Sequence, residues 1–408
     1  MEVRPILSAM RRNKMGGILI AAQMALTLAI LCNALFIIEQ RIASSNRPTG
    51  VDESNVFVIE NQWVGHPPDL AARLEADLAA LRALPGVLDA FASNSYVLAD
   101  GGSSEGVKLN PDQTGATVET AVYYADEHAV QSLGLKLIAG RNFNSDEIVE
   151  RLGHDEVPLP AVIITRVLAN KLSPAKSILG QRIFFSLRSG SPGVPVVGIV
   201  EQLQGPWVAE PWATNFIENS ALVPVRMVSR RVEYIVHARA GQLAAVLKAA
   251  ETKLFDVNHG RVLVKSIPLR DAREQAYKND RGLAAILAVV STALVAVTSF
   301  GIVGLTSYWV AQRRRQIGVR RALGATRRAI VHYFQTENLM ITAAGATLGI
   351  VLALLANLWM VNAFAMQRLH SGYALIGAII VLLLGQAAVL WPALKAASIP
   401  PALVMRAA

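Results

Sequence analysis

The chain has 408 residues, of which 53% are hydrophobic and 17% are charged, and its formal net charge at pH 7 is +9. This composition excludes a disordered chain and favours a membrane protein. The positive charge does not indicate a nucleic-acid partner, because residues 39–282 hold 25 Lys and Arg against 28 Asp and Glu. The basic excess lies beside long apolar segments instead, where it indicates membrane orientation.

The first apolar segment follows a basic N-terminus. Residues 1–16 carry four Lys and Arg side chains, and residues 17–38 carry no charge. About 20 apolar residues cross the ~30 Å hydrocarbon layer of a bilayer, so 17–38 is predicted to be the first span. The run is too long for a signal peptide, and we expect an uncleaved signal anchor with residues 1–16 in the cytoplasm.

Residues 39–267 are predicted to lie on the outer side of the membrane, because the first span carries the chain across from the cytoplasm. Their mixed pattern of helix and strand signals is typical of an α+β domain. Residues 101–115, rich in Gly, Ser, Asn and Asp, are expected to form a mobile loop. Residues 205–212 contain two tryptophans that form either an exposed contact site or, as we favour, a buried loop tip. The expected strands are 55–59, 87–92, 118–124, 161–165, 194–200, 221–225, 234–238 and 262–267, and the expected helices are 69–84, 126–133 and 242–255.

A polar helix is predicted to lead from this domain into the second span. Pro268 suits the first position of a helix, and no helix breaker follows it before Gly282. We therefore expect residues 268–282 to form a stalk of roughly 20 Å that continues without interruption into the second span, 283–310.

The segment 311–337 contains the densest run of positively charged residues in the chain. Between Arg313 and Arg328 it has seven arginines and no acidic residue. Short loops rich in Lys and Arg stay cytoplasmic, so this loop is predicted to face the cytoplasm. The remaining segments are then a third span, a short outer loop, a fourth span and a cytoplasmic tail, at 338–362, 363–372, 373–394 and 395–408.

Small residues recur at four-residue spacing in two of the predicted spans. The first span has Ala21, Ala25 and Ala29, and the third has Gly345 and Gly349. Small residues on one face allow helices to approach closely in lipid, so these five are candidate packing positions. Alanine and glycine are also common in spans generally, which is the alternative interpretation. The sequence therefore predicts an α-helical four-span transmembrane domain with a large α+β periplasmic domain between spans 1 and 2.

The chain offers no pattern of an enzyme of its own. No phosphate-binding Gly-x-x-x-x-Gly-Lys-Ser/Thr motif occurs, and the seven histidines are not paired at metal-ligand spacing. Cys32 is the only cysteine and lies in the first span, so no internal disulfide is expected. The spans hold no charged residue for an ion relay, which argues against a transporter driven by an ion gradient. We expect no bound cofactor or metal.

The arginine loop resembles a known family. Its sequence, RRRQIGVRRALGATRR at Arg313–Arg328, resembles the signature loop of the FtsX-like permease superfamily of ABC transporters. Residues 392–403 resemble that family's closing pattern, and residues 134–143 and 196–200 resemble the MacB-like periplasmic core. The resemblance implies a porter-like subdomain at about 51–125 and 221–268 and an inserted subdomain at about 126–220.

The resemblance also implies partners. The loop of this family carries a short helix that docks on an ATPase, so the helix Ile317–Ala325 is expected to contact an ABC ATPase subunit that uses ATP and Mg. The implied coupling residues are Arg313, Arg314, Arg315, Ile317, Val319, Arg320, Arg321, Ala322, Leu323, Gly324, Arg327 and Arg328. Full MacB proteins carry the ATPase ahead of the first span, whereas about 16 residues precede it here, so a separate ATPase subunit is expected.

The expected function is that of an export permease in the bacterial inner membrane with both termini cytoplasmic. The ATPase pushes the loop, and the second span transmits the displacement to the outer domain, which expels a small molecule or peptide toward a periplasmic adaptor. A second permease copy or a related permease is expected to pair through the first two spans, with Ala25 in the interface. Two rival functions are a non-transporting regulator of cell-wall hydrolases and a lipoprotein-releasing permease. The alternative role of the arginines is topology and contact with membrane lipids alone.

Overall fold

The computed structural model describes residues 14–65, 67–112, 117–152, 157–185, 193–208, 210–364 and 367–398. Contacts divide the chain into two compact units, Met1–Ser45 with Asp280–Ala408, and Asn46–Asn279. We call them the membrane unit and the α/β domain. Among the described residues, four helices of the membrane unit are long and apolar enough to span a bilayer, and the α/β domain lies between the first and second of them in the chain. The predicted fold class is therefore confirmed. Most of the N-terminal segment and of the tail lies outside the described residues.

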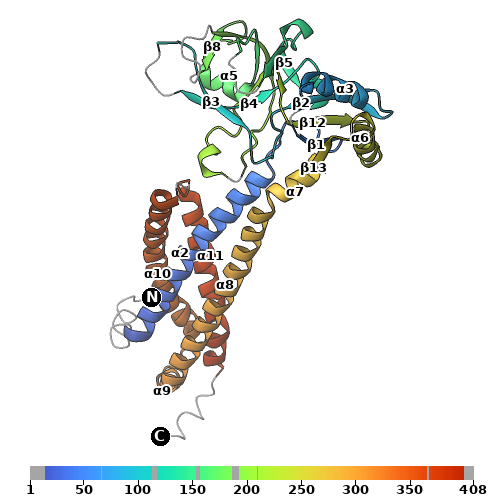
Figure 1. Cartoon of the computed structure of the whole chain (residues 1–408). Helices are drawn as coiled ribbons and strands as arrows, with labels where there is room; N and C mark the ends of the chain where they lie inside the picture. The colour runs from blue at the N-terminus through green and yellow to red at the C-terminus, as the bar shows by residue number, and fades with distance from the viewer. Residues whose placement is uncertain are drawn as a thin grey trace. The chain divides into compact units, whose positions relative to one another are not determined.

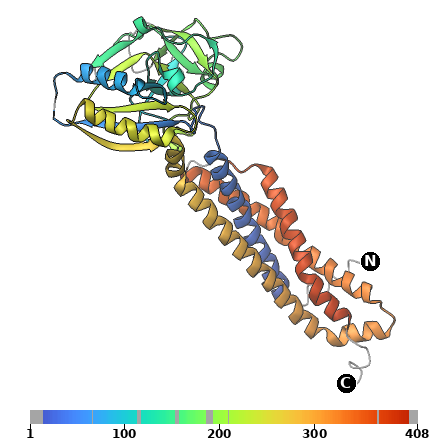
Figure 2. The same ribbon diagram turned by 90° about the vertical axis from the view of Figure 1, so that its right-hand side faces the viewer.

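The long helices of the membrane unit lie side by side (Figures 1 and 2). Each extends beyond the apolar run predicted as its span, because flanking residues such as Arg and Glu are good helix formers and continue its hydrogen bonds. A short helix, α9, connects the second of them to the third. The helices are α2 Lys14–Ser45, α8 Lys278–Gln312, α9 Arg314–Ala322, α10 Arg327–Phe364 and α11 Ser371–Ala397.

The small residues of α2 and α10 pack against each other within one chain. A Cβ atom at Gly345 would lie 2.7 Å from the carbonyl oxygen of Ala21, and one at Gly349 would lie 2.9 Å from that of Ala25. Glycine at these positions therefore permits the close approach of two helix backbones. Ala25 is 1% exposed and Ala29 is 8% exposed. Placing Ala25 in a dimer interface was wrong, because α10 already covers this face of α2.

Polar side chains also join the helices. The hydroxyls of Thr27 on α2 and Thr298 on α8 form a hydrogen bond of 2.8 Å. The Asn33 amide nitrogen donates to the carbonyl oxygen of Ala353 on α10 at 3.1 Å. Both bonds are buried, and a polar group in hydrocarbon needs such a partner. They therefore help to fix the register of α2 against its neighbours.

One layer of the α/β domain is an antiparallel four-stranded sheet in the order β13-β1-β12-β2. Helices α3 and α6 lie side by side (Figure 2). Their leucine, valine and alanine stripes bury one face of the sheet, including Phe57 and Tyr234. The elements are β1 Val56–Trp63, α3 Leu70–Arg82, β2 Val87–Ser93, β12 Arg231–Ala238, α6 Leu243–Val257 and β13 Arg261–Pro268.

A second, mixed sheet of seven strands has the order β5-β9-β7-β10-β4-β3-β8. Its β10–β4 and β7–β9 pairs are parallel, and helix α5 packs on it, while β6 and β11 form a separate parallel pair. The elements are β3 Ser103–Lys108, β4 Val118–Tyr124, α4 Ala129–Ser132, β5 Leu137–Gly140, β6 Val149–Leu152, β7 Val162–Thr165, α5 Arg166–Leu172, β8 Arg182–Phe185, β9 Val194–Val200, β10 Ser220–Val223 and β11 Val225–Val228.

The boundary between the two layers differs from the predicted subdomains. We assigned 51–125 and 221–268 to the porter-like part, but β3, β4 and β10 pair within the seven-stranded sheet. Alternation along a strand shows that it is half-buried and does not show which sheet it joins. The loop expected at 101–115 contains β3, whose polar sequence has a low strand propensity. Pairing with β4 and β8 on either side stabilises it instead.

The predicted continuous stalk at 268–282 is also corrected. Helix α7, Leu269–Ala276, ends at Tyr277 before α8 begins at Lys278. The Tyr277 side chain is fully buried, and its hydroxyl accepts a hydrogen bond of 3.0 Å from Gln204 in the α/β domain. Burying this aromatic ring and satisfying its hydroxyl favours a break in the helix over a straight rod. Helix α7 consequently belongs to the α/β domain.

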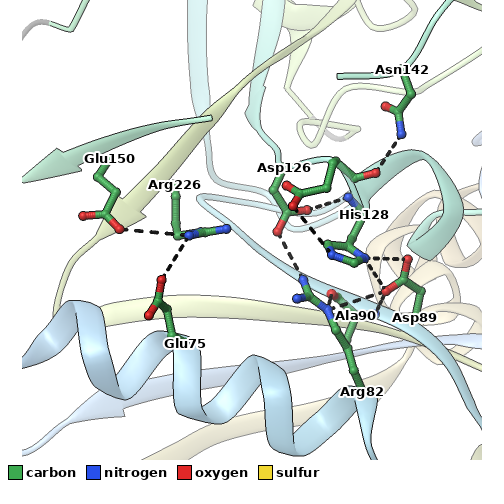
Figure 3. Close-up of polar contacts among 10 residues, drawn as sticks. Glu75, Arg82, Asp89, Ala90, Asp126, His128, Asn142, Glu150 and Arg226 are labelled. Carbon is green, nitrogen blue, oxygen red and sulfur yellow. Dashed lines mark hydrogen bonds and ion pairs between the residues drawn. The ribbon is translucent and has the colours of Figure 1, made fainter. Parts of the chain in front are cut away.

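Ion pairs join the two layers of the α/β domain (Figure 3). Arg82 on α3 donates to the carboxylate of Asp126, which follows β4, at 3.3 Å. His128 Nδ1 lies 2.9 Å from Asp89 on β2. Burial raises the pKa of Asp126, while the positive charge of Arg82 acts in the opposite direction. The joint is therefore polar and charge-compensated.

The tryptophan-containing segment is only partly a buried loop tip. Trp207 is 7% exposed, whereas Trp212 is 52% exposed. Their ring centroids lie 5.1 Å apart, and both rings contact Phe216. The prediction of burial is therefore right for Trp207 and wrong for Trp212, which is the exposed end of an aromatic cluster.

Candidate functional site

The arginine-rich turn is built around α9. The helix begins after Arg313 and ends in a Schellman motif, in which Ala325 N–H donates to the Arg320 carbonyl and Gly324 N–H donates to that of Arg321, at 3.0 and 3.1 Å. Gly324 has a φ of +97°, a conformation that favours glycine. The helix expected at Ile317–Ala325 therefore lies earlier, at Arg314–Ala322, because this glycine ends it.

One face of α9 is anchored to the rest of the membrane unit. Arg313 donates two hydrogen bonds to the carboxylate of Glu337 on α10, at 3.0 and 2.8 Å. Arg321 donates to the carbonyl oxygen of Ala397 at the end of α11, at 3.0 Å. Ile317 is 6% exposed and belongs to the apolar core of the unit. These contacts tie the turn to α10 and α11, so a force on α9 acts on both helices.

The opposite face of α9 is open. Leu323 is 83% exposed and Val319 is 46% exposed, and both lie among charged side chains rather than in an uncharged span. The exposed residues around them are mostly arginines. Further exposed arginines follow just after the end of α9. The exposed members of this outward surface are Arg314, Arg315, Val319, Ala322, Leu323, Arg327 and Arg328. The surface combines positive charge with apolar anchors, a composition suited to an acidic protein partner.

A hollow of about 160 Å³ lies in the angle between α9 and the first turns of α10. The guanidinium of Arg320 lies 4.8 Å from the ring centroid of Tyr333, a cation–π geometry. Other parts of the lining are apolar and are formed by side chains such as Ile330 and Phe334. The hollow can therefore accept an apolar side chain from a partner.

The structure divides the predicted coupling residues into two groups. Ile317, which we expected to supply apolar contact, faces inward, and Arg313, Arg320 and Arg321 make contacts within the chain. Val319, Ala322 and Leu323 remain available. Glu337, the last residue of the predicted segment 311–337, was not among the predicted coupling residues. Its ion pair could have been predicted from the sequence, because Glu337 is an acidic residue that borders an apolar run and lies near seven arginines.

Nothing in the described ranges points to a metal centre, since no group of three or more His, Cys, Asp and Glu side chains converges there. His66 and His154 lie outside the described residues. The positions expected to pack helices, Ala21, Ala25, Ala29, Gly345 and Gly349, lie away from the turn and serve the α2–α10 contact or its surroundings.

Two family models match the chain. The MacB-like periplasmic core domain matches residues 16–254, which is more than half of the chain. The FtsX-like permease C-terminal domain matches residues 288–401, a region that includes α9 and the outward surface. The two matches cover both units described above.

Curated relatives share low sequence identity with the chain. It is 23% identical over 334 residues to the uncharacterized ABC transporter permease YknZ of Bacillus subtilis, covering 76% of this chain and 74% of that protein. It is also 23% identical over 224 residues to the macrolide export ATP-binding/permease protein MacB of Campylobacter jejuni, covering 54% of this chain. The matched stretch spans 33% of that MacB protein.

Solved structures similar to the chain include two domains of such proteins. The extracellular domain of YknZ aligns with 51% of this chain and 100% of its own, at 18% identity and a TM-score of 0.32. The periplasmic region of MacB from Actinobacillus actinomycetemcomitans aligns with 55% of this chain and 94% of its own, at 13% identity and a TM-score of 0.33. On the two family matches, the chain belongs to the FtsX-like ABC transporter permeases with a MacB-like periplasmic core domain.

Proposed function

We propose that this multi-pass membrane protein is the permease subunit of an ABC-type export system. A separate ATPase subunit, which binds ATP and Mg, docks on the outward surface of the arginine turn. The observation that carries this proposal is the pairing of an exposed Leu323 with a ring of arginines on a helix whose other face is anchored. A role in membrane topology alone requires the charges and does not require exposed apolar residues among them.

The anchoring supports transmission of force. Because Arg313 is bonded to Glu337 and Arg321 to Ala397, a displacement of α9 is shared by α10 and α11 as well as by α8. Helix α8 is continuous in sequence with α7 and β13 of the α/β domain. Because α7 ends at Tyr277, a push along α8 reaches the domain through the short α7–α8 connection rather than through one continuous helix.

The remaining parts of the proposal rest on the relatives. One relative bears the name of a macrolide export protein, which supports efflux of a small molecule, peptide or similar substrate. We place the chain in the bacterial inner membrane with both termini cytoplasmic, as the arginine-rich turn and its flanks favour. It works as a dimer of two copies or with a related permease, and with a periplasmic adaptor. Membrane lipids surround the exposed apolar faces of the spans.

The test reverses charge on the outward surface while sparing the anchoring contacts. Arg314 and Arg315 are changed to Glu in one variant, and Leu323 to Asp in another. Lys248 and Lys253, exposed on α6 of the α/β domain, are changed to Glu as a control with the same change in net charge. The readout is co-purification of an ABC ATPase subunit with the permease from native membranes, with insertion of the permease followed in parallel.

We expect both turn variants to insert normally and to lose about 30-fold or more in ATPase binding, the effect of removing an interface hot spot. The control should retain the ATPase. Undiminished ATPase binding in both turn variants would contradict the docking role. Failed insertion of the Arg314 and Arg315 variant, with normal ATPase binding by the Leu323 variant, would favour a role in topology alone.

A further inference from the structure

Two glutamates face each other in the four-stranded sheet of the α/β domain. Glu60 on β1 and Glu233 on β12 are direct partners in the antiparallel register. Residues directly opposite on one face of such a pair have Cβ atoms about 4.5–5.5 Å apart, so their carboxyl groups lie within reach of each other. Both residues are buried, with 8% and 7% of their surface exposed. Like charges in this arrangement repel each other, and the fold must compensate for them.

The groups around the pair supply only part of that compensation. From β12, the Arg231 guanidinium lies 3.1 Å from Glu60 and 3.4 Å from Glu233, but its side chain is 64% exposed. From β13, Lys265 stands opposite Glu60 in the register. From the segment after β2, the Tyr96 hydroxyl donates to Glu60 at 3.1 Å. Among the hydrogen bonds of the described residues, Glu233 Oε2 is buried and has no partner.

An unpartnered, buried carboxylate oxygen beside a second carboxylate is satisfied most simply by a proton. A protonated carboxyl group has one O–H donor, and the neighbouring carboxylate is an acceptor. Two carboxyl groups that share a site cannot both ionise easily, and their titration belongs to the pair rather than to either residue. Burial, followed by the negative charge of Glu60, raises the pKa of Glu233 to about 7.

We propose that Glu60 and Glu233 form one proton-binding site of the α/β domain, in which the two carboxyl groups share a single proton at neutral pH and release it as the pH rises. Release leaves two buried negative charges next to the half-exposed Arg231 and so weakens the contact between β1 and β12. The site goes beyond the proposed function, since it lies in the α/β domain and involves no residue of the arginine turn.

The residues that contact the site connect it to other parts of the chain, so proton release can affect those parts. Lys265 is on β13, which runs through Pro268 into α7 and from there to α8, the second candidate span. Tyr96 is on the segment that leaves the four-stranded sheet for the seven-stranded one. That segment also contains Leu98 and Asp100, which have φ values of +71° and +59°. Such conformations are strained for residues other than glycine, so the segment depends on contacts such as the Tyr96–Glu60 bond.

The test follows protonated carboxyl groups directly by infrared spectroscopy. Full-length protein in detergent micelles is titrated from about pH 5 to pH 9, a range in which ordinary carboxyl groups are ionised. Spectra of Glu233→Gln are subtracted from those of the wild type, so that other buried acids such as Asp126 cancel. Glu201→Gln is the control, because hydrogen bonding from Lys136 lowers the pKa of that partly exposed carboxyl group.

We expect the wild type minus Glu233→Gln difference to show a carboxyl band that disappears with a midpoint near pH 7, and the Glu201→Gln difference to show none. Glu60→Gln should move the midpoint down by about one pH unit or more, because it removes the like charge. This second variant decides the question alone if Glu233→Gln does not fold. Absence of a titrating band near neutral pH, or a midpoint unmoved by Glu60→Gln, would overturn the shared site.

Discussion

Arg313 and Glu337 form an ion pair across the corner between α9 and α10, in which one guanidinium nitrogen of Arg313 lies 3.0 and 2.8 Å from the two carboxylate oxygens of Glu337. The Glu337 side chain is 6% exposed and the Arg313 side chain is 17% exposed. The pair therefore fixes the turn at the point where the chain enters the third candidate span. Its geometry separates the inward, anchoring arginines from those of the outward surface.

Removing one partner of this pair should loosen the turn. Glu337→Gln leaves Arg313 without its carboxylate, and we expect a loss of about 1–3 kcal/mol in the stability of the membrane unit, the effect of an unsatisfied, mostly buried polar group. Thermal unfolding in detergent measures this loss, and limited proteolysis at the turn locates it. Arg313→Gln combined with Glu337→Gln should lose less than the sum of the single variants. Strict additivity would show that the two side chains do not interact.

Glycine-to-alanine substitutions should have opposite signs at two positions in the spans. Gly345→Ala places a methyl group 2.7 Å from the Ala21 carbonyl oxygen and forces α2 and α10 apart. Gly304 on α8 has no atom within 4 Å of such a Cβ, so Gly304→Ala should be neutral or stabilise by up to about 1 kcal/mol through helix propensity. Thermal denaturation of the detergent-solubilised chain compares the two. Equal tolerance at both positions would contradict the α2–α10 contact.

The buried pair of Asp77 and Arg261 should be essential to the α/β domain. Both side chains are fully buried, and they form two hydrogen bonds of 2.8 and 2.7 Å. Asp77→Asn should destabilise the domain by about 3–5 kcal/mol, because a buried guanidinium loses its counter-charge. The exposed Arg166, 3.5 Å from Glu201, is the control, and Arg166→Ala should leave the unfolding midpoint nearly unchanged. Tryptophan fluorescence can follow both, since Trp63 lies against Arg261.

The stability of the α/β domain should fall as the pH rises through the neutral range. The pKa of Glu233 rises from an ordinary value of 4.5 to about 7 on folding. Between these two values the folded state holds a proton that the unfolded state has lost, so each increase in pH favours unfolding. Glu147, whose pKa is lowered by Arg141, acts in the opposite sense, but at pH values below 4.5. Unfolding midpoints measured from about pH 5 to pH 7 should decrease in the wild type.

The same measurement on Glu233→Gln should give a flatter dependence on pH, because the variant has no proton to release at this position. Glu201→Gln should keep the slope of the wild type. If the slope in Glu233→Gln is as steep as that of the wild type, the pH dependence comes from another group. Asp126 is then the first candidate, because its pKa is also raised.

The sequence by itself determined the spans, the arginine-rich turn and the family. These are properties of contiguous residues: an uncharged run long enough to cross hydrocarbon forms a helix there whatever its neighbours are, and a dense run of arginines stays out of the bilayer. The strand bounds 118–124 and 194–200 were also predicted exactly. They too depend on contiguous residues, because β-branched and aromatic residues are concentrated within each segment.

Only the tertiary structure decided which sheet β3, β4 and β10 join, that α7 ends at Tyr277, and that Ala25 packs on Gly349 rather than on a second chain. It also separated the anchoring Arg313 from the exposed Arg314 and placed Glu60 opposite Glu233. Each of these outcomes depends on residues distant in sequence that compete for the same partner. A strand or helix pattern records that a face is buried, whereas the packing of the whole unit determines what buries it.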